Sequence, residues 1–528
     1  MDKGKRRNKI GICLINGVDE KKRVGVVVLF CLFCAGLALL PASTSSPLYA
    51  TNFWTDSNIY FTIGRGMIHG LVPYRDLFDH KGPLIFMIYA VGALLSEKSF
   101  LGVYFLEVIS LALTLLLTYK IVRLHCSSAT ALLAVPIMAA FTVSCTAFNQ
   151  GGSAEEFCLP ALTFILYAAM RLMDKQVELD RSREQGLLFG FGLATGWIFM
   201  IKFTICGLAL GLGSFILVTT LYCEGASKML WSLLWLAIGF FVICAVPIVY
   251  LLLNHTLILA FDIYFIQNIF EYGDSTMSFK EHLYNAAAYF RTQGAINQAV
   301  RNLTIIGCFG ALLYQCMKKE RGFILKALSF SVSAGVFLLG VYWGSIAHPY
   351  YAIVFAPLMT LGLCSIGVLM ERGLKLAQKP AILLVFCSLS TILLIPFVIF
   401  RCQAWPLHMV KRDEMAQTRF AQILEEKGDG TLLDLTSHDQ GFYLASGRLP
   451  SFRYFIDNNL DTQEKRESIN GYLKDARPDY VVCWWRDPGE NYSLIAEETS
   501  PFDLNDLRTY KLYERKADNE NGLGVTMQ

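Results

Sequence analysis

The chain has 528 residues, of which 54% are hydrophobic and only 17% are charged. A soluble domain carries more charge, so this composition excludes an ordinary soluble enzyme and indicates a chain that lies mostly in lipid. The formal net charge of +3 comes largely from short basic loops and therefore does not indicate a nucleic-acid partner.

The first predicted element is an apolar run from Val24 to Leu40 that follows a strongly basic N-terminal segment. A bilayer span needs about 20 mostly apolar residues, and basic flanks mark the cytoplasmic side. The same parts, with the small-residue run Pro41 to Ser46, would also suit a signal peptide. The apolar core is longer than that of a usual signal peptide, and more membrane segments follow. We therefore expect an uncleaved anchor with a cytoplasmic N-terminus.

Residues 42–99 form the first predicted outer loop, and its charged residues lie close to the membrane surface. They are Asp56, Arg65, Arg75, Asp76, Asp79, His80 and Lys81. Charged side chains in such a place imply a site. The apolar stretch Gly82 to Leu95 is short for a span, and counting it as one would put most later basic loops outside. It is predicted to be a re-entrant or interfacial helix.

The remaining apolar runs predict further spans. They are Phe100 to Tyr119, Ala129 to Ala147, Phe157 to Leu172, Leu187 to Ile201, Ile205 to Tyr222, Met229 to Leu253, Leu303 to Cys316, Ala327 to Trp343, Tyr350 to Met370 and Ala381 to Phe400. With the first run they make about eleven spans. Their alternation places the connections rich in Lys and Arg in the cytoplasm, as the positive-inside rule requires. The prediction is a polytopic α-helical membrane protein whose chain finally leaves the membrane on the outer side.

Two later outer segments are also polar. The segment Asn149 to Glu156 joins two spans and ends in the adjacent carboxylates Glu155 and Glu156. Because lipid excludes a carboxylate, at least one of them should face protein or a water-filled cavity. We expect one in the acceptor or donor site and the other in solvent. The segment His255 to Arg301 mixes charged and aromatic residues without a recognisable motif.

The pattern changes after the last span, and residues 401–528 are predicted to be a soluble α/β module outside the membrane. Its predicted strands are Thr431 to Leu435, Asp479 to Trp484 and Thr509 to Glu514, with a helix over Thr462 to Ala476. Most cysteines lie in apolar runs and form neither a zinc spacing nor a disulfide framework. Cys402 and Cys483 are both outside in this topology, and the sequence leaves their pairing open.

The most informative stretch is NFWTDSNIY, from Asn52 to Tyr60, followed by GLVPYRDLFDHKGPL, from Gly70 to Leu84. These segments resemble the GT-C glycosyltransferases, in particular the relatives of protein O-mannosyltransferase and lipid A aminoarabinose transferase (glycosyltransferase family 39). In that family an acidic residue soon after the first span precedes a Pro-Tyr turn and a Lys-Pro-Pro-Leu-like segment that opens a short helix. Asp56 matches the first part, and the segment from Asp79 matches the second.

The resemblance extends beyond the first loop. The run Gly186 to Lys202 looks like the family's Gly-rich span ending in Lys, and the run His348 to Pro357 looks like its late aromatic segment. Two positions depart from the pattern. Ser57 stands where many relatives carry a second acid, which weakens a paired-carboxylate or metal mechanism, and Gly82 replaces the first Pro. We expect no cofactor, and the sequence leaves a divalent metal open.

The chemistry of transfer from a lipid phosphate selects the candidate residues. It needs one carboxylate to take the acceptor's proton and one or more cations to stabilise the departing phosphate. The predicted catalytic carboxylates are Asp56, as general base, with Asp79 and Glu155. The predicted phosphate-binding cations are Arg75, Lys81 and Lys202. The predicted substrate-binding side chains are Tyr60, His80, Glu156, His348 and Tyr350.

Several of these residues also have a purely structural interpretation. Asp56 suits the N-cap of a short helix, and Lys81 and Lys202 suit interfacial lysines that snorkel. Arg75 can pair with neighbouring acids and only shape the loop. Aromatic residues such as Tyr350 are expected at an interface in any membrane protein.

The sequence therefore predicts a membrane glycosyltransferase that moves a sugar from a polyprenyl phosphate to an extracytoplasmic acceptor, such as a cell-envelope glycan, lipid or protein. A single displacement would invert the anomeric carbon. The alternative is a polytopic transporter or flippase of envelope lipids or glycans. Transporters place ionisable sites near the bilayer midplane and often contain inverted repeats. Here the charged residues cluster in outer loops, and the sequence has no visible repeat, so the enzyme is favoured.

Overall fold

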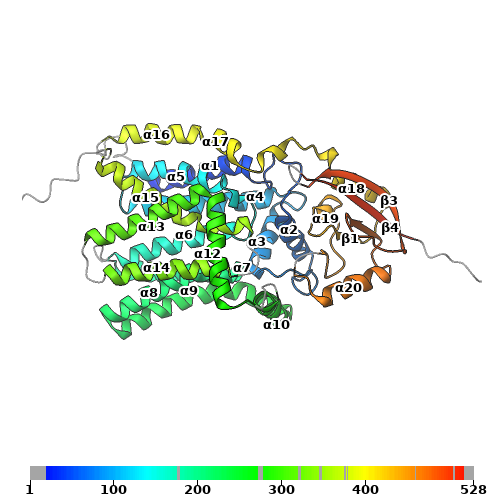
Figure 1. Ribbon diagram of the computed structural model, residues 1–528, viewed down its shortest axis with the longest axis horizontal. Coiled ribbons are helices and arrows are strands. Elements are labelled where there is room, and N and C mark those ends of the chain that lie inside the picture. The colour runs from blue at the N-terminus through cyan, green and yellow to red at the C-terminus, as the bar shows by residue number, and fades with distance from the viewer. Residues whose placement is uncertain are drawn as a thin grey trace, which may run out of the picture.

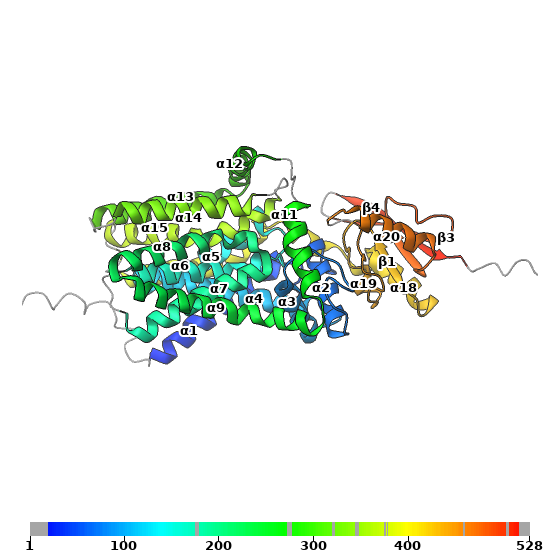
Figure 2. The same cartoon turned by 90° about the horizontal axis from the view of Figure 1, so that it is seen from below.

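The protein divides into a bundle of long helices and a smaller module that contains a sheet, placed end to end along the long axis (Figure 1). The computed structural model describes residues 20–174, 179–271, 277–318, 323–343, 348–373, 376, 379–457, 460–502 and 506–516. Figure 2, turned by 90°, shows the same division, with the sheet module at one end of the bundle.

The bundle is built from helices that coincide with the predicted spans. They are α1 (Glu20–Ala42), α4 (Leu101–Arg123), α5 (Ser128–Val143), α6 (Leu159–Met173), α7 (Arg181–Lys202), α8 (Gly207–Glu224), α9 (Ala226–Leu253), α13 (Gln298–Lys318), α14 (Phe323–Val341), α15 (Ala356–Gly373), α16 (Pro380–Ile392) and α17 (Leu394–Arg401). Each predicted apolar run falls on one of these helices or, for the last run, on the pair α16 and α17.

The surface of the bundle is apolar, as lipid requires. Among the described residues, six helical stretches are long and apolar enough to cross a membrane, and the bent pair α16 and α17 would make a seventh. One of the six, Arg181–Glu224, is 44 residues long and contains both α7 and α8. Large side chains such as Phe241 and Leu253 on α9 are exposed. The polytopic membrane bundle is confirmed, and the total of about eleven spans stays a prediction.

The first outer loop contains two short helices, α2 (Thr55–Ile68) and α3 (Pro83–Leu95), which pack against each other. α3 is the predicted short apolar helix, and it begins at Pro83, a residue that suits the first helical position. α2 begins after Trp54, which occupies the N-cap without a side-chain cap bond. Asp56 therefore lies in the first turn of α2, and its interpretation as the N-cap is wrong.

Short helical segments connect the long helices near the end of the bundle that faces the module. They are η1 (Thr146–Phe148), η2 (Glu156–Cys158), η3 (Phe203–Cys206), α10 (Leu257–Phe261), the π-helical η4 (Asp262–Gln267), α11 (Asn268–Phe270), α12 (Phe279–Ile296) and η5 (Pro349–Phe355). Figure 1 shows α12 running across the bundle helices rather than along them. These segments supply many of the polar side chains at that end.

The module begins where α17 ends and is a four-stranded sheet with helices. Its elements are η7 (Trp405–Met409), η8 (Arg412–Glu414), α18 (Ala416–Lys427), β1 (Leu432–Leu435), α19 (Phe442–Ala445), α20 (Gln463–Lys474), β2 (Tyr480–Cys483), β3 (Tyr492–Pro501) and β4 (Leu507–Arg515). The strand order is β1-β2-β4-β3; β1 and β2 are parallel, and the other pairs are antiparallel. The predicted strands and helix are present, β3 is an additional strand, and Cys402 and Cys483 are both buried and free.

The module is attached to the first outer loop by direct hydrogen bonds. The guanidinium of Arg65 on α2 donates to three module carbonyls at 3.3–3.4 Å, those of Tyr443, Gly447 and Arg448. The backbone N–H of Phe78 donates to the carbonyl of Arg453 at 2.9 Å. The side chain of Arg453 donates in turn through Nε to the carbonyl of Tyr74 at 3.0 Å. The loop that contains the predicted site is thus fixed between the bundle and the module.

Candidate active site

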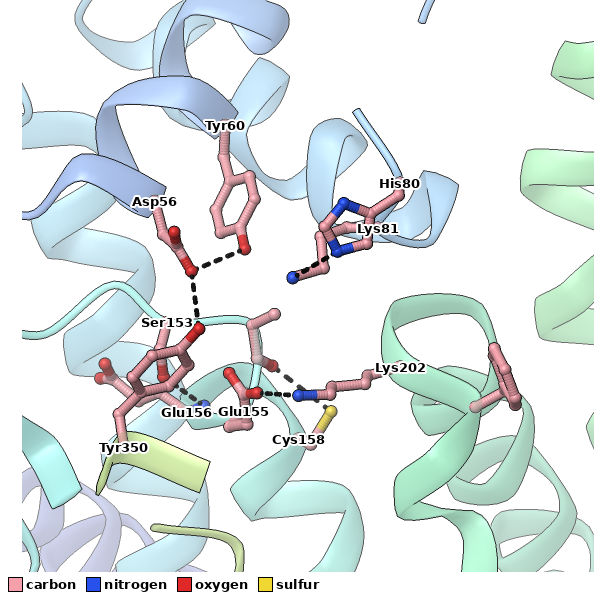
Figure 3. Close-up of polar contacts among 12 residues, drawn as sticks. Asp56, Tyr60, His80, Lys81, Ser153, Glu155, Glu156, Cys158, Lys202 and Tyr350 are labelled. Carbon is pink, nitrogen blue, oxygen red and sulfur yellow. Dashed lines mark hydrogen bonds and ion pairs between the residues drawn. The ribbon is translucent and has the colours of Figure 1, made fainter. Parts of the chain in front are cut away.

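Asp56 is held by two tyrosines from separate parts of the chain. Its Oδ2 accepts hydrogen bonds from the hydroxyls of Tyr60 (3.3 Å), one turn further along α2, and Tyr350 (3.2 Å), on η5 (Figure 3). The ring of Trp54 packs edge-on against Tyr350, with centroids 5.0 Å apart. Asp56 is only partly buried. Since both bonds are at the long end of the usual range and both go to Oδ2, the carboxylate has room to accept a further hydrogen bond.

The segment before α3 positions Lys81. Asp79 is buried, and its Oδ1 accepts the backbone N–H of Lys81 at 2.8 Å, which fixes the turn. The Nζ of Lys81 lies 3.1 Å from Nε2 of His80. Burial, followed by the charges of Lys81 and Lys202, lowers the pKa of His80 well below its ordinary value. A neutral imidazole accepts a hydrogen bond from an ammonium group, so His80 holds Lys81 without adding charge.

Glu155 and Lys202 form a largely buried ion pair. The Nζ of Lys202, at the end of α7, lies 2.5 Å from Oε1 of Glu155. The same ammonium lies 3.5 Å from the ring centroid of Tyr351 on η5. The other carboxylate oxygen of Glu155 is buried without a hydrogen-bond partner among the described residues. Figure 3 shows Asp56, Lys81 and the Glu155–Lys202 pair directed toward one another from different elements.

Gly82 connects the two lysine-bearing segments and explains one departure from the family pattern. Its N–H donates to the carbonyl of Ile201 at 3.2 Å, directly before Lys202. A Cβ at this position would stand 2.2 Å from the carbonyl oxygen of Met200, which is far too close. A proline here would clash in the same way and would lack the N–H. The close approach of the loop to α7 therefore requires glycine.

Glu156 lies beside Glu155 but has a different partner. Its Oε2 accepts the backbone N–H of Gly152 at 2.7 Å. Both glutamates are buried, so the expectation that one of them would be solvated is wrong. The reason is the short loop Asn149 to Glu156, which folds back into the bundle: the hydroxyl of Tyr89 on α3 donates to the carbonyl of Gly152 at 2.6 Å.

Arg75 and His348 occupy different surroundings. Arg75 is half exposed, and its guanidinium bonds the neighbouring Asp76 through Nε (2.9 Å) and a terminal nitrogen (2.7 Å). Its described partner is thus Asp76 in the same loop, whereas Lys81 contacts His80 and Lys202 contacts Glu155. His348 stacks on Tyr350 with centroids 5.4 Å apart, and burial is the main cause that lowers its pKa. His348 therefore supports the aromatic wall beside Asp56.

Two side chains near this cluster are not among the predicted site residues. Tyr351 stands directly after Tyr350, and the double tyrosine after a proline is a signal that could have included it. His438, in the module, lies within electrostatic range of Asp56 and Lys81. Its position depends on how the module packs on the first loop, and the sequence holds no signal for that packing.

The described part of the chain contains no group of three or more His, Cys, Asp or Glu side chains arranged to hold a metal ion. The site consists instead of one partly exposed carboxylate, two lysines and the residues that fix them. This set can accept a proton and bind an anionic leaving group.

Comparison with known proteins identifies the fold that contains this site. The family model described as dolichyl-phosphate-mannose-protein mannosyltransferase matches residues 80–251. The structure is similar to that of ArnT from Cupriavidus metallidurans bound to undecaprenyl phosphate, with a TM-score of 0.57 and 14% identity, over 94% of this chain and 98% of that one. The fold is that of the GT-C glycosyltransferases.

The apo structure of the same ArnT gives a TM-score of 0.56 and 12% identity, over 93% of this chain and 98% of that one. No curated protein sequence matches the chain. The predicted resemblance to GT-C glycosyltransferases is thus confirmed at the level of fold and family model, in a multi-pass membrane protein.

Proposed function

We propose that this GT-C protein transfers a sugar from a polyprenyl phosphate to a hydroxyl acceptor on the extracytoplasmic side of its membrane. The observation that carries the proposal is the convergence of the Asp56 carboxylate with Lys81 and Lys202 at one end of the bundle (Figure 3). The similarity to an ArnT structure that binds undecaprenyl phosphate supports a polyprenyl donor. The charged groups gather at the end of the bundle rather than in its middle, which does not favour a transporter.

In the proposed reaction, Asp56 takes the proton of the acceptor hydroxyl while that oxygen attacks the anomeric carbon of the donor sugar. The bond between this carbon and the phosphate oxygen breaks, and the polyprenyl phosphate leaves with the electron pair. Lys81 and Lys202 stabilise the charge of the leaving phosphate. Attack and departure on opposite faces invert the anomeric carbon. Tyr60 and Tyr350 orient the carboxylate of Asp56.

The other two predicted carboxylates receive positioning roles in this proposal. Asp79 bonds the backbone of Lys81 and so places its side chain. Glu155 neutralises and orients Lys202. Asp79 and Glu155 are almost completely buried, whereas Asp56 is partly exposed, so an acceptor hydroxyl can reach Asp56 more readily. Asp56, bonded only to phenols in the described contacts, is the best base of the three.

The proposed orientation places the site and the module outside, because the connections rich in Lys and Arg lie between the opposite ends of the helices. The exposed Cys223, at the end of α8, is then cytoplasmic. A membrane-impermeant thiol reagent applied to intact cells should label a cysteine introduced at the exposed Lys98 and should not label Cys223. Labelling of Cys223 alone would reverse the orientation.

The transfer itself is tested with purified protein and a panel of polyprenyl-phosphate sugars. Release of the polyprenyl phosphate in the presence of hydroxyl acceptors is the expected result for at least one donor. The Asp56→Asn variant serves as the matched inactive control. A protein that binds polyprenyl phosphate but releases it from no donor in the panel contradicts the proposal.

A further inference from the structure

The loop between β1 and α19, residues 436–441, packs directly on the helix that carries Asp56. The hydroxyl of Thr62 on α2 donates to Oδ2 of Asp439 at 2.6 Å. A Cβ added to Gly441 would lie 3.6 Å from the hydroxyl oxygen of Thr51 and 3.7 Å from Oδ1 of Asn58. Figure 1 shows β1 and α19 beside α2. The loop therefore covers the first turns of α2 from the module side.

This loop is held in one conformation. The buried Asp434 accepts hydrogen bonds from the N–H (2.9 Å) and the hydroxyl (2.5 Å) of Thr436, and a longer one from the N–H of Gln440 (3.4 Å). Asp439 in turn accepts the N–H of Gly441 at 2.7 Å. Ser437 has a φ of +79°, which a non-glycine residue rarely adopts. Such conformations persist where the surroundings enforce them, and they are concentrated at functional sites.

His438 lies in the middle of this loop, between Ser437 and Asp439. The loop follows the carboxyl end of β1, the edge at which parallel strands present ligand-binding loops. The Nδ1 of His438 lies 3.1 Å from the hydroxyl of Ser437, and the ring is only partly buried. Burial lowers the pKa of His438, Asp56 raises it, and Lys465 and Lys81 lower it further. The imidazole is thus neutral near pH 7 and stands within electrostatic range of the proposed base.

His438 belongs to the module, and the module side of the site suits the acceptor rather than the donor. A lipid-linked donor would reach the site from the bundle side, where Lys81 and Lys202 are proposed to bind its phosphate. The acceptor hydroxyl must reach Asp56, and the module covers α2 on the side away from the membrane helices. A neutral imidazole there matches a hydroxyl group, with which it can exchange a hydrogen bond, better than an anion.

We propose that His438 is a substrate-contacting residue that binds a hydroxyl of the acceptor while Asp56 deprotonates the attacking one. The inference rests on the proposed glycosyl transfer and assigns the acceptor subsite to the contact between the module and α2. It implies an acceptor with at least two hydroxyl groups near the attachment point, as in a glycan. A histidine that served only to stabilise the loop through its contact with Ser437 would not contribute to acceptor binding.

The test compares His438→Ala and His438→Gln in the transfer assay with the full-length protein. We expect the alanine variant to raise the acceptor KM about five- to tenfold, as expected for one lost hydrogen bond. Its affinity for polyprenyl phosphate should not change, and glutamine should recover part of the loss. His69→Ala is the matched control, because His69 is exposed at the far end of α2 and pairs with Glu97.

An unchanged acceptor KM in His438→Ala overturns the inference while leaving the proposed transfer intact. An equal loss of acceptor and donor binding also overturns it, because that result indicates damage to the fold. A second measurement does not require turnover: the double variant Asp56→Cys, His438→Cys in a Cys223→Ser background should be cross-linked by a short bifunctional thiol reagent. Absence of this cross-link rejects the placement of His438, whereas absence of transfer by the parent protein rejects the proposed function.

Discussion

Two aspartates, Asp56 on α2 and Asp439 packed against it, show how differently one kind of side chain can be used. Asp439 is fully buried, and its oxygens accept short bonds from Thr62 (2.6 Å) and Gly441 (2.7 Å). Asp56 is partly exposed and accepts only the longer bonds of two phenols, at 3.2 and 3.3 Å. A carboxylate satisfied by short bonds inside the protein joins structural parts, whereas a partly exposed carboxylate with long bonds is available for a proton.

Asp56→Asn should separate these two uses most strongly. The amide keeps the size of the side chain but cannot take a proton, so we expect kcat to fall by about 10²- to 10⁴-fold, which corresponds to roughly 2.7 to 5.4 kcal/mol of barrier. The melting temperature should stay close to that of the parent. Turnover within about threefold of the parent, at saturating donor and acceptor, would transfer the base role to Glu155 or Asp79.

Lys81→Ala should have the next largest effect, on donor binding. Removing a charge-assisted contact with phosphate costs about 1.5 to 3 kcal/mol, or roughly ten- to a hundredfold in affinity. Equilibrium binding of a polyprenyl phosphate to the purified variant measures this loss. Lys98→Ala, an exposed lysine in the same loop, is the matched control and should bind like the parent. Equal binding by both variants contradicts the role of Lys81.

Asp439→Asn should give the reverse of Asp56→Asn. One partner of a buried bond across the interface becomes poorly matched, and such losses cost about 1 to 3 kcal/mol of stability. We expect a lower melting temperature for the full chain in detergent, with the kcat of transfer, measured at saturating donor and acceptor, unchanged per folded molecule. A variant as stable as the parent but inactive in this reaction would place Asp439 in the chemistry and end the contrast with Asp56.

A different kind of effect is expected from the buried carboxyls of the module, which should make stability depend on pH. Burial, followed by the charge of Asp439, raises the pKa of Asp434 from 3.8 to about 8. Between these values the folded state holds a proton that the unfolded state has released, so stability falls as pH rises from about 4 to about 8. Melting temperatures across this range should show the slope, and Asp434→Asn should flatten it. If the dependence of melting temperature on pH persists in this variant, groups other than Asp434 cause it.

The sequence predicts much of the bundle because local signals determine it. Long apolar runs give the helices, and Pro83 gives the start of α3. The first loop likewise brings Asp56 and Lys81 together through a contiguous motif. In contrast, β3 is mostly polar and partly exposed, so its sequence lacks the alternation of a half-buried strand, and its pairing with β4 makes it a strand.

The site's long-range partners could not be predicted for a related reason. Tyr350 reaches Asp56 across 294 positions of sequence, and Lys202 reaches Glu155 across 47. Such pairs depend on how helices pack, and no local pattern encodes them. His438 is the extreme case, because its place near Asp56 depends on the docking of a separate module.

The bond between Arg65 and the carbonyl of Tyr443 joins residues 378 positions apart. At a synthesis rate of about 5 to 20 residues per second, the second residue leaves the ribosome roughly 20 to 75 s after the first. Throughout that interval α2 is already made but lacks the module that covers it, so the Arg65 guanidinium lacks its three module carbonyls. The complete site is therefore a late product of biosynthesis.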